Sequence, residues 1–304
     1  MSKVGDLEPD PSVIGNIVKP PFVRLPDPKQ LFIDRARRFR ALADGHDLAA
    51  YLTFLADLSD AQAGIQDSLP EPEMPPAGNL ARAREHRMPP LDRSRFTADA
   101  AFDATLERLL AAADAIDMPA AAREALTRLR QAEAAIPTMI RNALDDTIPI
   151  ESLAEHVFVA AALQVHFARM AQRLDPTQLG PVGDGACPAC GGAPAASLIV
   201  GWPNAQGSRF CSCSLCSTLW NYVRARCTVC GKTEKISYQE IEGGAGQVKA
   251  EICESCGSYS KVLHQHKNNA LDPVADDVAS LGLDLLVREL GFRRGSVNLF
   301  LLGY

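Results

Sequence analysis

The cysteines carry the clearest chemical signal in this sequence. All nine lie between Cys187 and Cys256, and the first 186 residues contain none. Eight of them form Cys-x2-Cys pairs, and 22 residues separate the two pairs of each set: Cys187, Cys190, Cys213 and Cys216, then Cys227, Cys230, Cys253 and Cys256. Each cysteine of the second set follows its counterpart by 40 residues. Thiolates at such spacing are typical of tetrahedral metal sites, so these eight cysteines are predicted to be metal ligands.

The spacing has a physical reason. Two residues between cysteines allow one tight turn to direct both sulfur atoms at a single point. Gly191 and Gly231 follow the second cysteine of a pair, where a positive φ is often needed. The spacer is long enough for a hairpin that returns the second turn to face the first. Four sulfur ligands close a tetrahedral site to substrate, which favours a structural role for the metal.

Two features of these sites stay open at this point. The sequential sets follow the repeat, but a crossed arrangement would join Cys187 and Cys190 to the last pair. Tetrahedral sulfur sites suit either zinc or iron. A site of one divalent ion and four thiolates carries a net charge of −2. Basic side chains nearby in the sequence either offset this charge or are ordinary solvated surface charges. These side chains are Arg209, Arg224, Arg226, Lys232, Lys235 and Lys261.

The remaining cysteine and the histidines give weaker signals. Cys211 has no Cys-x2-Cys partner and is interpreted as a buried thiol rather than a redox-sensitive one. His264 and His266 would share one face of a strand, but no third ligand is evident nearby. His156 and His166 lie ten residues apart on a predicted helix and are interpreted as packing residues.

Other candidate residues also have structural explanations. Asp276 and Asp277 resemble paired catalytic carboxylates, but acidic residues are favoured at a helix start, which is where they are predicted to lie. Trp220 and Tyr222 alternate on a predicted strand, where they could cover a metal site or stack on nucleic acid bases. Motifs of phosphate-binding loops, zinc proteases, serine hydrolases and zinc deaminases are absent from the sequence.

Composition restricts the class of protein. The 304 residues suggest about two domains, and 47% hydrophobic with 22% charged residues is ordinary for a globular chain. Residues 1–180 carry a net charge of −6 and residues 181–304 are neutral, so nucleic acid is not expected as a partner. No apolar run is long enough to span a membrane, and the first residues lack the apolar core of a secretory signal. A cytoplasmic protein is therefore expected, in which clustered cysteines are metal ligands rather than disulfides.

The first half of the chain is predicted to be helical. Proline-rich residues 1–29 form an expected extended arm. Residues 30–178 are expected to form an all-helical domain of about five helices, because apolar residues recur at helical spacing. Within it, Pro137 should kink or break a helix, and residues 67–95, with six prolines, are predicted to be a long surface loop.

The second half is predicted to contain short strands. Residues 179–225 and 226–270 form the expected first and second four-cysteine modules, and residues 271–304 an expected helix and tail. Strands are predicted near 198–200, 219–226, 235–239 and 248–252. The fold class is therefore a multi-domain α+β protein. An N-terminal all-α domain is followed by two tandem rubredoxin-like, or zinc-ribbon-like, metal modules and a C-terminal helix.

The second half also resembles a known family. Six short runs of residues carry the resemblance. They are Cys187-Pro188-Ala189-Cys190-Gly191, Cys213-Ser214-Leu215-Cys216 with Trp220, Cys227-Thr228-Val229-Cys230, Cys253-Glu254-Ser255-Cys256-Gly257 with Tyr259 and Lys261, the run from Ala275 to Leu281, and Asn298-Leu299-Phe300-Leu301-Leu302. Together they are similar to the formate dehydrogenase accessory protein family, FdhE. The resemblance covers residues 187–302 well and the helical region mainly in class and length.

The resemblance implies a function. It implies a cytoplasmic, chaperone-like maturation factor that is not an enzyme and that binds the catalytic subunit of formate dehydrogenase before export. It also implies two rubredoxin-like modules in which the eight paired cysteines hold iron, with zinc as the alternative, and it gives no role to Cys211. Two other functions fit the residues: a thiol or iron redox protein acting on a partner, and a zinc-ribbon protein that binds nucleic acid. The oligomeric state is not predicted.

Overall fold

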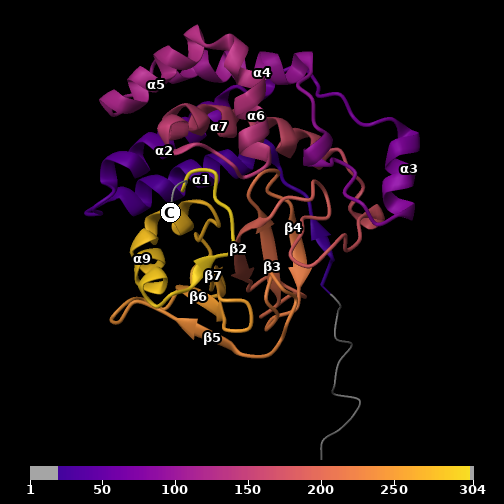
Figure 1. Cartoon of the computed structure of the whole chain (residues 1–304), viewed down its shortest axis with the longest axis vertical. Coiled ribbons are helices and arrows are strands. Elements are labelled where there is room, and N and C mark those ends of the chain that lie inside the picture. The colour runs from indigo at the N-terminus through magenta and orange to yellow at the C-terminus, as the bar shows by residue number, and fades with distance from the viewer. Residues whose placement is uncertain (1–19, 302–304) are drawn as a thin grey trace, which may run out of the picture.

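The computed structural model describes residues 20–301. Helices form one layer of the molecule and a sheet forms the other, with the N-terminal half in the helical layer (Figure 1). This arrangement confirms the predicted fold class. Of the arm expected at residues 1–29, residues 1–19 lie outside the described residues, as do the last three residues of the tail, while residues 20–29 contain a short strand and the start of the first helix. No helix within residues 20–301 is both long and apolar enough to cross a membrane.

Seven α-helices of the described chain build the helical layer. They are α1 (Pro28–Ala43), α2 (Ala49–Gly64), α3 (Ala77–Glu85), α4 (Ala100–Ala113), α5 (Ala120–Gln131), α6 (Ile136–Leu144) and α7 (Leu153–Gln172). Asp27 begins α1 by accepting a hydrogen bond from the backbone N–H of Gln30, and Asp99 begins α4 in the same way with Phe102. The side chains of α1 that repeat at helical spacing, Phe32 and Phe39, are fully buried.

Helix α7 is the centre of this layer. Sixteen of its twenty residues are buried, and it packs against α1, α2, α4, α5 and α6. A helix that is apolar on all sides is stable only when other elements surround it. The other helices are therefore organised around α7.

The helical layer differs from the prediction in one place and agrees with it in another. Residues 67–95 are not one loop, because α3 begins directly after Pro75 and Pro76 and continues through alanine and arginine, which favour helix. The predicted helix that contained Pro137 is two helices. The break expected at Pro137 is therefore present, and the proline lies in the first turn of α6, where its missing N–H does no harm.

The described strands form one eight-stranded sheet. Its strands are β1 (Val23–Arg24), β2 (Pro194–Ile199), β3 (Arg209–Cys213), β4 (Leu219–Tyr222), β5 (Ile236–Gln239), β6 (Val248–Cys253), β7 (Ser258–Leu263) and β8 (Arg293–Arg294). The order is β1-β4-β3-β2-β7-β6-β5, with β8 beside β7. The sequence patterns missed β1, β3, β7 and β8. Strands β3 and β7 are buried throughout, so they lack the alternation that identifies a half-exposed strand.

The 40-residue repeat of the cysteines extends to the strands. Strands β2, β3 and β4 correspond to β5, β6 and β7 at that offset, and both sets pair antiparallel. The first strand of one module then pairs in parallel with the last strand of the other, with Ser197 opposite Val262 and Leu198 opposite Leu263. The two modules therefore share one sheet. The domain boundaries expected from the sequence stay predictions.

The C-terminal helical segment is broken in two. Helix α8 (Ala275–Ala279) and helix α9 (Leu281–Glu289) meet at Ser280. The Asp272 carboxylate accepts hydrogen bonds from the backbone N–H groups of Val274 and Ala275 and so caps the start of this segment. Leu285 is 46% exposed. The break at Ser280 turns α9, so that Leu283 and Val287 face the sheet instead.

Charged residues are buried where the C-terminal segment meets the sheet. Lys261 on β7 lies 3.2 Å from the Asp277 carboxylate and 2.5 Å from that of Asp284, and Arg294 contacts the same two carboxylates. Burial acts to raise the pKa of Asp277, but Lys261 and Arg294 outweigh it and hold that pKa below its ordinary value. Asp276 pairs with Arg38 of α1. The two aspartates do lie at a helix start, but their carboxylates also bind this segment to the rest of the protein.

Removing one cation from this cluster should destabilise the protein strongly. We expect Lys261→Met to lower the free energy of unfolding by about 3–5 kcal/mol, because Asp277 and Asp284 would keep one buried cation between them. Lys249→Met is the control: Lys249 forms a partly exposed pair with Glu240, and its loss should cost about 0–1 kcal/mol. Urea unfolding at neutral pH measures the free energy of unfolding of both variants. Equal losses would contradict the role given to the buried cluster.

Candidate metal centres

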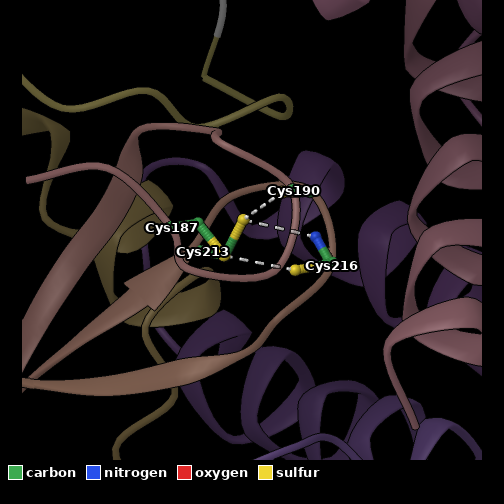
Figure 2. Close-up of side chains that lie close together, drawn as sticks. All are labelled: Cys187, Cys190, Cys213 and Cys216. Atoms are coloured by element: carbon green, nitrogen blue, oxygen red, sulfur yellow. Dashed lines mark hydrogen bonds between the residues drawn. The ribbon is translucent and has the colours of Figure 1, made fainter. Parts of the chain in front are cut away.

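The eight paired cysteines lie in two groups of four. In each group the four sulfur atoms all lie within 4.8 Å of one another. The closest pairs are Cys187 with Cys216 at 3.6 Å, Cys190 with Cys213 at 3.4 Å, and both Cys227 with Cys256 and Cys230 with Cys253 at 3.7 Å. Figure 2 shows the first four side chains converging from two turns. The groups follow the sequential arrangement, so the crossed alternative is wrong.

The geometry of both groups fits a metal ion. A metal–sulfur bond of about 2.3 Å implies about 3.8 Å between sulfur atoms of a regular tetrahedron, and the observed separations are close to that value. All nine cysteines are free thiols rather than disulfides. Both groups could therefore hold one ion each, and neither the spacing nor the geometry identifies the metal.

The turns that carry the cysteines share one backbone feature. The residue after the second cysteine of every pair has a positive φ: Gly191 at 78°, Ser217 at 56°, Gly231 at 70° and Gly257 at 69°. This confirms the expectation for Gly191 and Gly231. At Gly231 a Cβ would lie 2.3 Å from a carboxylate oxygen of Asp184, so any larger residue would displace that side chain. The turns also direct backbone N–H groups at sulfur, as from Leu215 and Cys216 to Cys213 at 3.4 Å.

Without a cation the first group is electrostatically unfavourable. Burial raises the pKa of Cys187 well above its ordinary value. For Cys213 burial acts in the same direction, but hydrogen bonds from Cys187, Cys190 and Cys216 outweigh it and lower the pKa well below its ordinary value. A site that favours one thiolate and opposes the next cannot hold four negative charges unaided. A bound cation removes that conflict.

The helical layer supplies part of the first centre. The backbone N–H groups of Leu91 and Arg93 bond to the carbonyls of Ala189 and Cys190. Burial acts to lower the pKa of Arg93, but Asp146 and the charges of Cys190 and Cys213 outweigh it and raise that pKa. Arg93 is therefore a cation beside the first group that the sequence did not reveal. Arg93 lies far from the cysteines in the sequence, and no local pattern identifies it as their charge partner.

The buried core joins the same two parts of the chain. The hydrophobic cluster that contains Phe32, Phe102 and Phe158 also contains the first four cysteines with Trp220. Gln164 of α7 donates a hydrogen bond to the carbonyl of Ser214, and Arg35 of α1 contacts the Ser217 hydroxyl. The first centre is thus embedded in the helical layer, whereas the second is not part of this cluster.

The basic residues suggested as charge partners behave differently. Arg209 and Lys261 are neither next to the sulfur groups nor on the surface, because both are buried against carboxylates. Arg209 lies on β3 and pairs at 2.9 Å with Glu251 on β6, which links the two modules. Arg226 forms an exposed pair with Asp184. Strand patterns do not distinguish a buried cation from a solvated one until its partner is known.

The two centres differ in exposure. The cysteines of the first group are all fully buried. In the second group Cys227 is 5% exposed and Cys253 is 2% exposed, while Cys230 and Cys256 are half-buried. The second centre therefore lies nearer to solvent.

The weaker candidates have structural roles in the described chain. Cys211 is fully buried, and burial raises its pKa, as expected of an inert thiol. The rings of His264 and His266 contact each other, and neither belongs to a metal-binding group among residues 20–301. His156 is buried and bonds to the Ser152 carbonyl. His166 packs against Phe96 and Phe102.

The fold and the sites define a helical protein that carries a duplicated four-cysteine ribbon. Models of the FdhE family match almost all of the described chain: the N-terminal model at residues 20–184, the central domain at 186–224 and the C-terminal domain at 225–301. The chain therefore belongs to the FdhE family, which confirms the resemblance seen in the sequence.

Individual relatives agree with this assignment. A protein named FdhE homolog from Rhizobium meliloti (strain 1021) is 48% identical over 304 residues and covers 99% of both chains. One from Proteus mirabilis (strain HI4320) is 35% identical and covers 91% of this chain and 90% of its own. The crystal structure of the FdhE protein from Pseudomonas aeruginosa superposes with a TM-score of 0.81 at 32% identity and covers 93% of this chain and 99% of that one.

Variants of two cysteines can distinguish metal ligation from simple burial of a thiol. We expect Cys256→Ser to lower the bound metal from two ions per chain to one, because it removes a sulfur from the second group. Cys211→Ala should leave both ions bound, since Cys211 belongs to neither group. Elemental analysis and native mass spectrometry of anaerobically purified protein measure the content. Equal metal content in the two variants would contradict ligation by the second group.

The difference in exposure predicts an order of metal loss. Under a graded chelator with a thiol-alkylating reagent, we expect Cys230 and Cys256 to be modified first and the buried first group later, because reagents reach the second group directly. Peptide mapping by mass spectrometry follows each cysteine. Cys211 is the internal control and should react only on unfolding. Modification of the first group before the second would refute this order.

Proposed function

We propose that the protein is an accessory factor in the maturation of formate dehydrogenase. It binds the catalytic subunit in the cytoplasm before export, and it is not itself an enzyme. The observation that carries the proposal is membership of the FdhE family across the chain, together with both complete groups of four cysteines. Four sulfur ligands leave no open position for a substrate on the metal, which favours a binding role over catalysis.

The eight paired cysteines are the proposed ligands. The ions are iron by family resemblance, and zinc is the alternative that elemental analysis distinguishes. When bound, the ions neutralise the thiolates and supply folding energy to modules that are too small to hold an adequate core of their own. In this proposal the centres shape a docking surface rather than react.

A redox role is the second candidate, and one observation favours it. The half-buried Cys230 and Cys256 place the second centre where a partner could approach an iron ion closely. A one-electron change at that iron would need no open coordination position. Potentiometry on the iron-loaded protein tests this candidate independently, since zinc has no accessible redox change.

Co-isolation tests the main proposal. We expect the affinity-tagged chain, loaded with metal and kept under reducing, low-salt conditions, to retain the formate dehydrogenase catalytic subunit when the two are produced together. Cells that lack the chain should make that subunit but lose formate oxidation, and the purified chain alone should oxidise no formate. An unrelated tagged protein with a four-cysteine site is the control, because it shows whether the subunit is retained merely by a metal ion or by thiols. Failure to retain the subunit under these conditions would overturn the proposal.

A further inference from the structure

Helix α3 is held away from the body of the protein. It lies at the outer edge of the helical layer (Figure 1), and within its nine described residues Ala83 alone is buried. A cavity of about 440 Å³ lies on one side of it, against the loop before α4 and the end of α7. A second cavity, of about 730 Å³, lies on the other side, against the segment that follows α7. Both volumes are in the range of ligand sites.

The two cavities adjoin each other. Met74, Ala83, Met88 and Pro90 line both. Methionine is flexible and polarisable, and it recurs on surfaces that accept varied apolar side chains. Proline keeps the rim extended without internal hydrogen bonds. We call this combined depression, lined by residues 73–99, 166–170 and 173–182 together with Pro188, the α3 groove.

Unpaired arginines surround the α3 groove. Arg82 and Arg95 line the first cavity, and Arg84 and Arg87 line the second. All four are exposed, and none forms an ion pair with any part of residues 20–301. Arg84 acts on Asp175 only through its charge at longer range. This positive group stands out in a chain whose net charge is −6.

The carboxylates that line the groove are mostly occupied. Asp92, Asp99 and Asp175 accept hydrogen bonds from backbone N–H groups at the starts of helical turns. They keep their negative charge, but their oxygens are engaged by backbone N–H groups, and none of them forms an ion pair with the four arginines in the described chain. Glu73 is exposed at the rim. The groove therefore carries charges of both signs over an apolar lining, and its four arginines have no ion-pair partner within residues 20–301.

One buried polar atom lies at the inner end of the first cavity. His166 is 1% exposed and lines the cavity, and its Nε2 atom has no hydrogen-bond partner among the described residues. The nearest carboxylate oxygen, on Asp99, is 3.8 Å away, which is too far for a hydrogen bond. A buried polar atom without a partner is unfavourable. A group that enters the cavity could supply the missing partner.

The groove is also attached to the first metal centre. Pro188, inside the first cysteine pair, lines the second cavity. The loop that carries Pro89 and Pro90 bonds to the same turn through Leu91 and Arg93. The shape of the groove therefore depends on that turn.

We propose that the α3 groove binds an extended, acidic segment of a partner protein. Its apolar side chains enter the two cavities, and its carboxylates pair with Arg82, Arg84, Arg87 and Arg95. Clusters of arginine are a recurring means of recognising acidic motifs. A peptide is favoured over nucleic acid because the lining is methionine and proline rather than a row of aromatic stacking platforms. This inference does not depend on which protein is the partner.

Peptide selection on the full-length, metal-loaded protein tests the proposal. A library of random peptides is selected against it, and enriched peptides are measured by fluorescence anisotropy at low and high salt. We expect enriched sequences that combine acidic and apolar residues, with affinity that falls as salt rises. A synthetic peptide of residues 1–19 is measured alongside, since that segment carries Asp6, Glu8 and Asp10. Binding by that peptide alone would overturn the proposal of a foreign partner.

Charge-reversal variants locate the binding site. R82E with R95E, and separately R84E with R87E, should each weaken binding about tenfold or more, because they reverse charges facing the peptide. The control is R288E with R293E, which reverses two arginines that are equally exposed and unpaired in the described chain but lie at the C-terminal end, outside the groove. All variants alter exposed side chains, so folding should persist.

No enrichment of peptides, or equal peptide binding by the groove variants and the control variant, would refute the α3 groove as the site. Single-stranded RNA is added as a competitor. If it displaces the peptide completely, the groove is a nucleic acid site instead.

Discussion

The structure depends on four sulfur atoms held together in a buried place. In the first group the closest sulfur pairs lie 3.4 and 3.6 Å apart, with no water-exposed surface on any of the four cysteines. Neutral thiols tolerate such crowding, but thiolates repel one another strongly away from water. The group is thus stable either as thiols with little to hold the turns together, or around a cation that binds all four. The tight turns with positive φ suit the second state, because they bring each sulfur to one centre.

Duplication explains the sheet, and buried charges explain why the copies stay together. Each module alone offers three short strands with an open edge, which is a weak structure. Pairing β2 with β7 joins them into one sheet, and the Arg209–Glu251 pair fixes their relative position from within. Such a pair is a poor source of stability but tolerates few alternative arrangements, since a displaced partner leaves an isolated buried charge. The Lys261 cluster acts in the same way where α8 and α9 join the sheet.

The two centres differ because only the first is embedded in the core of the helical layer. The first shares the core of the helical layer and is bordered by Arg93, so its sulfur atoms are sealed. The second is not part of that core and keeps two half-buried cysteines. The same motif can therefore serve two purposes: one copy organises the helices and the α3 groove beside it, and the other remains close to solvent.

Local patterns were sufficient for the chemistry of the sites and for most of the helices. The spacing of Cys187 to Cys256 predicts both groups, because two residues between cysteines make one turn whatever surrounds it. Helical periodicity likewise predicted an all-helical domain over residues 30–178. Only the tertiary structure decided the rest: the pairing of β2 with β7, the burial of Lys261 and Arg209, the place of Arg93, and the unequal exposure of the two groups. Those features arise from contacts between residues far apart in the chain, and a charged or buried strand residue looks the same in sequence until its partner is in place.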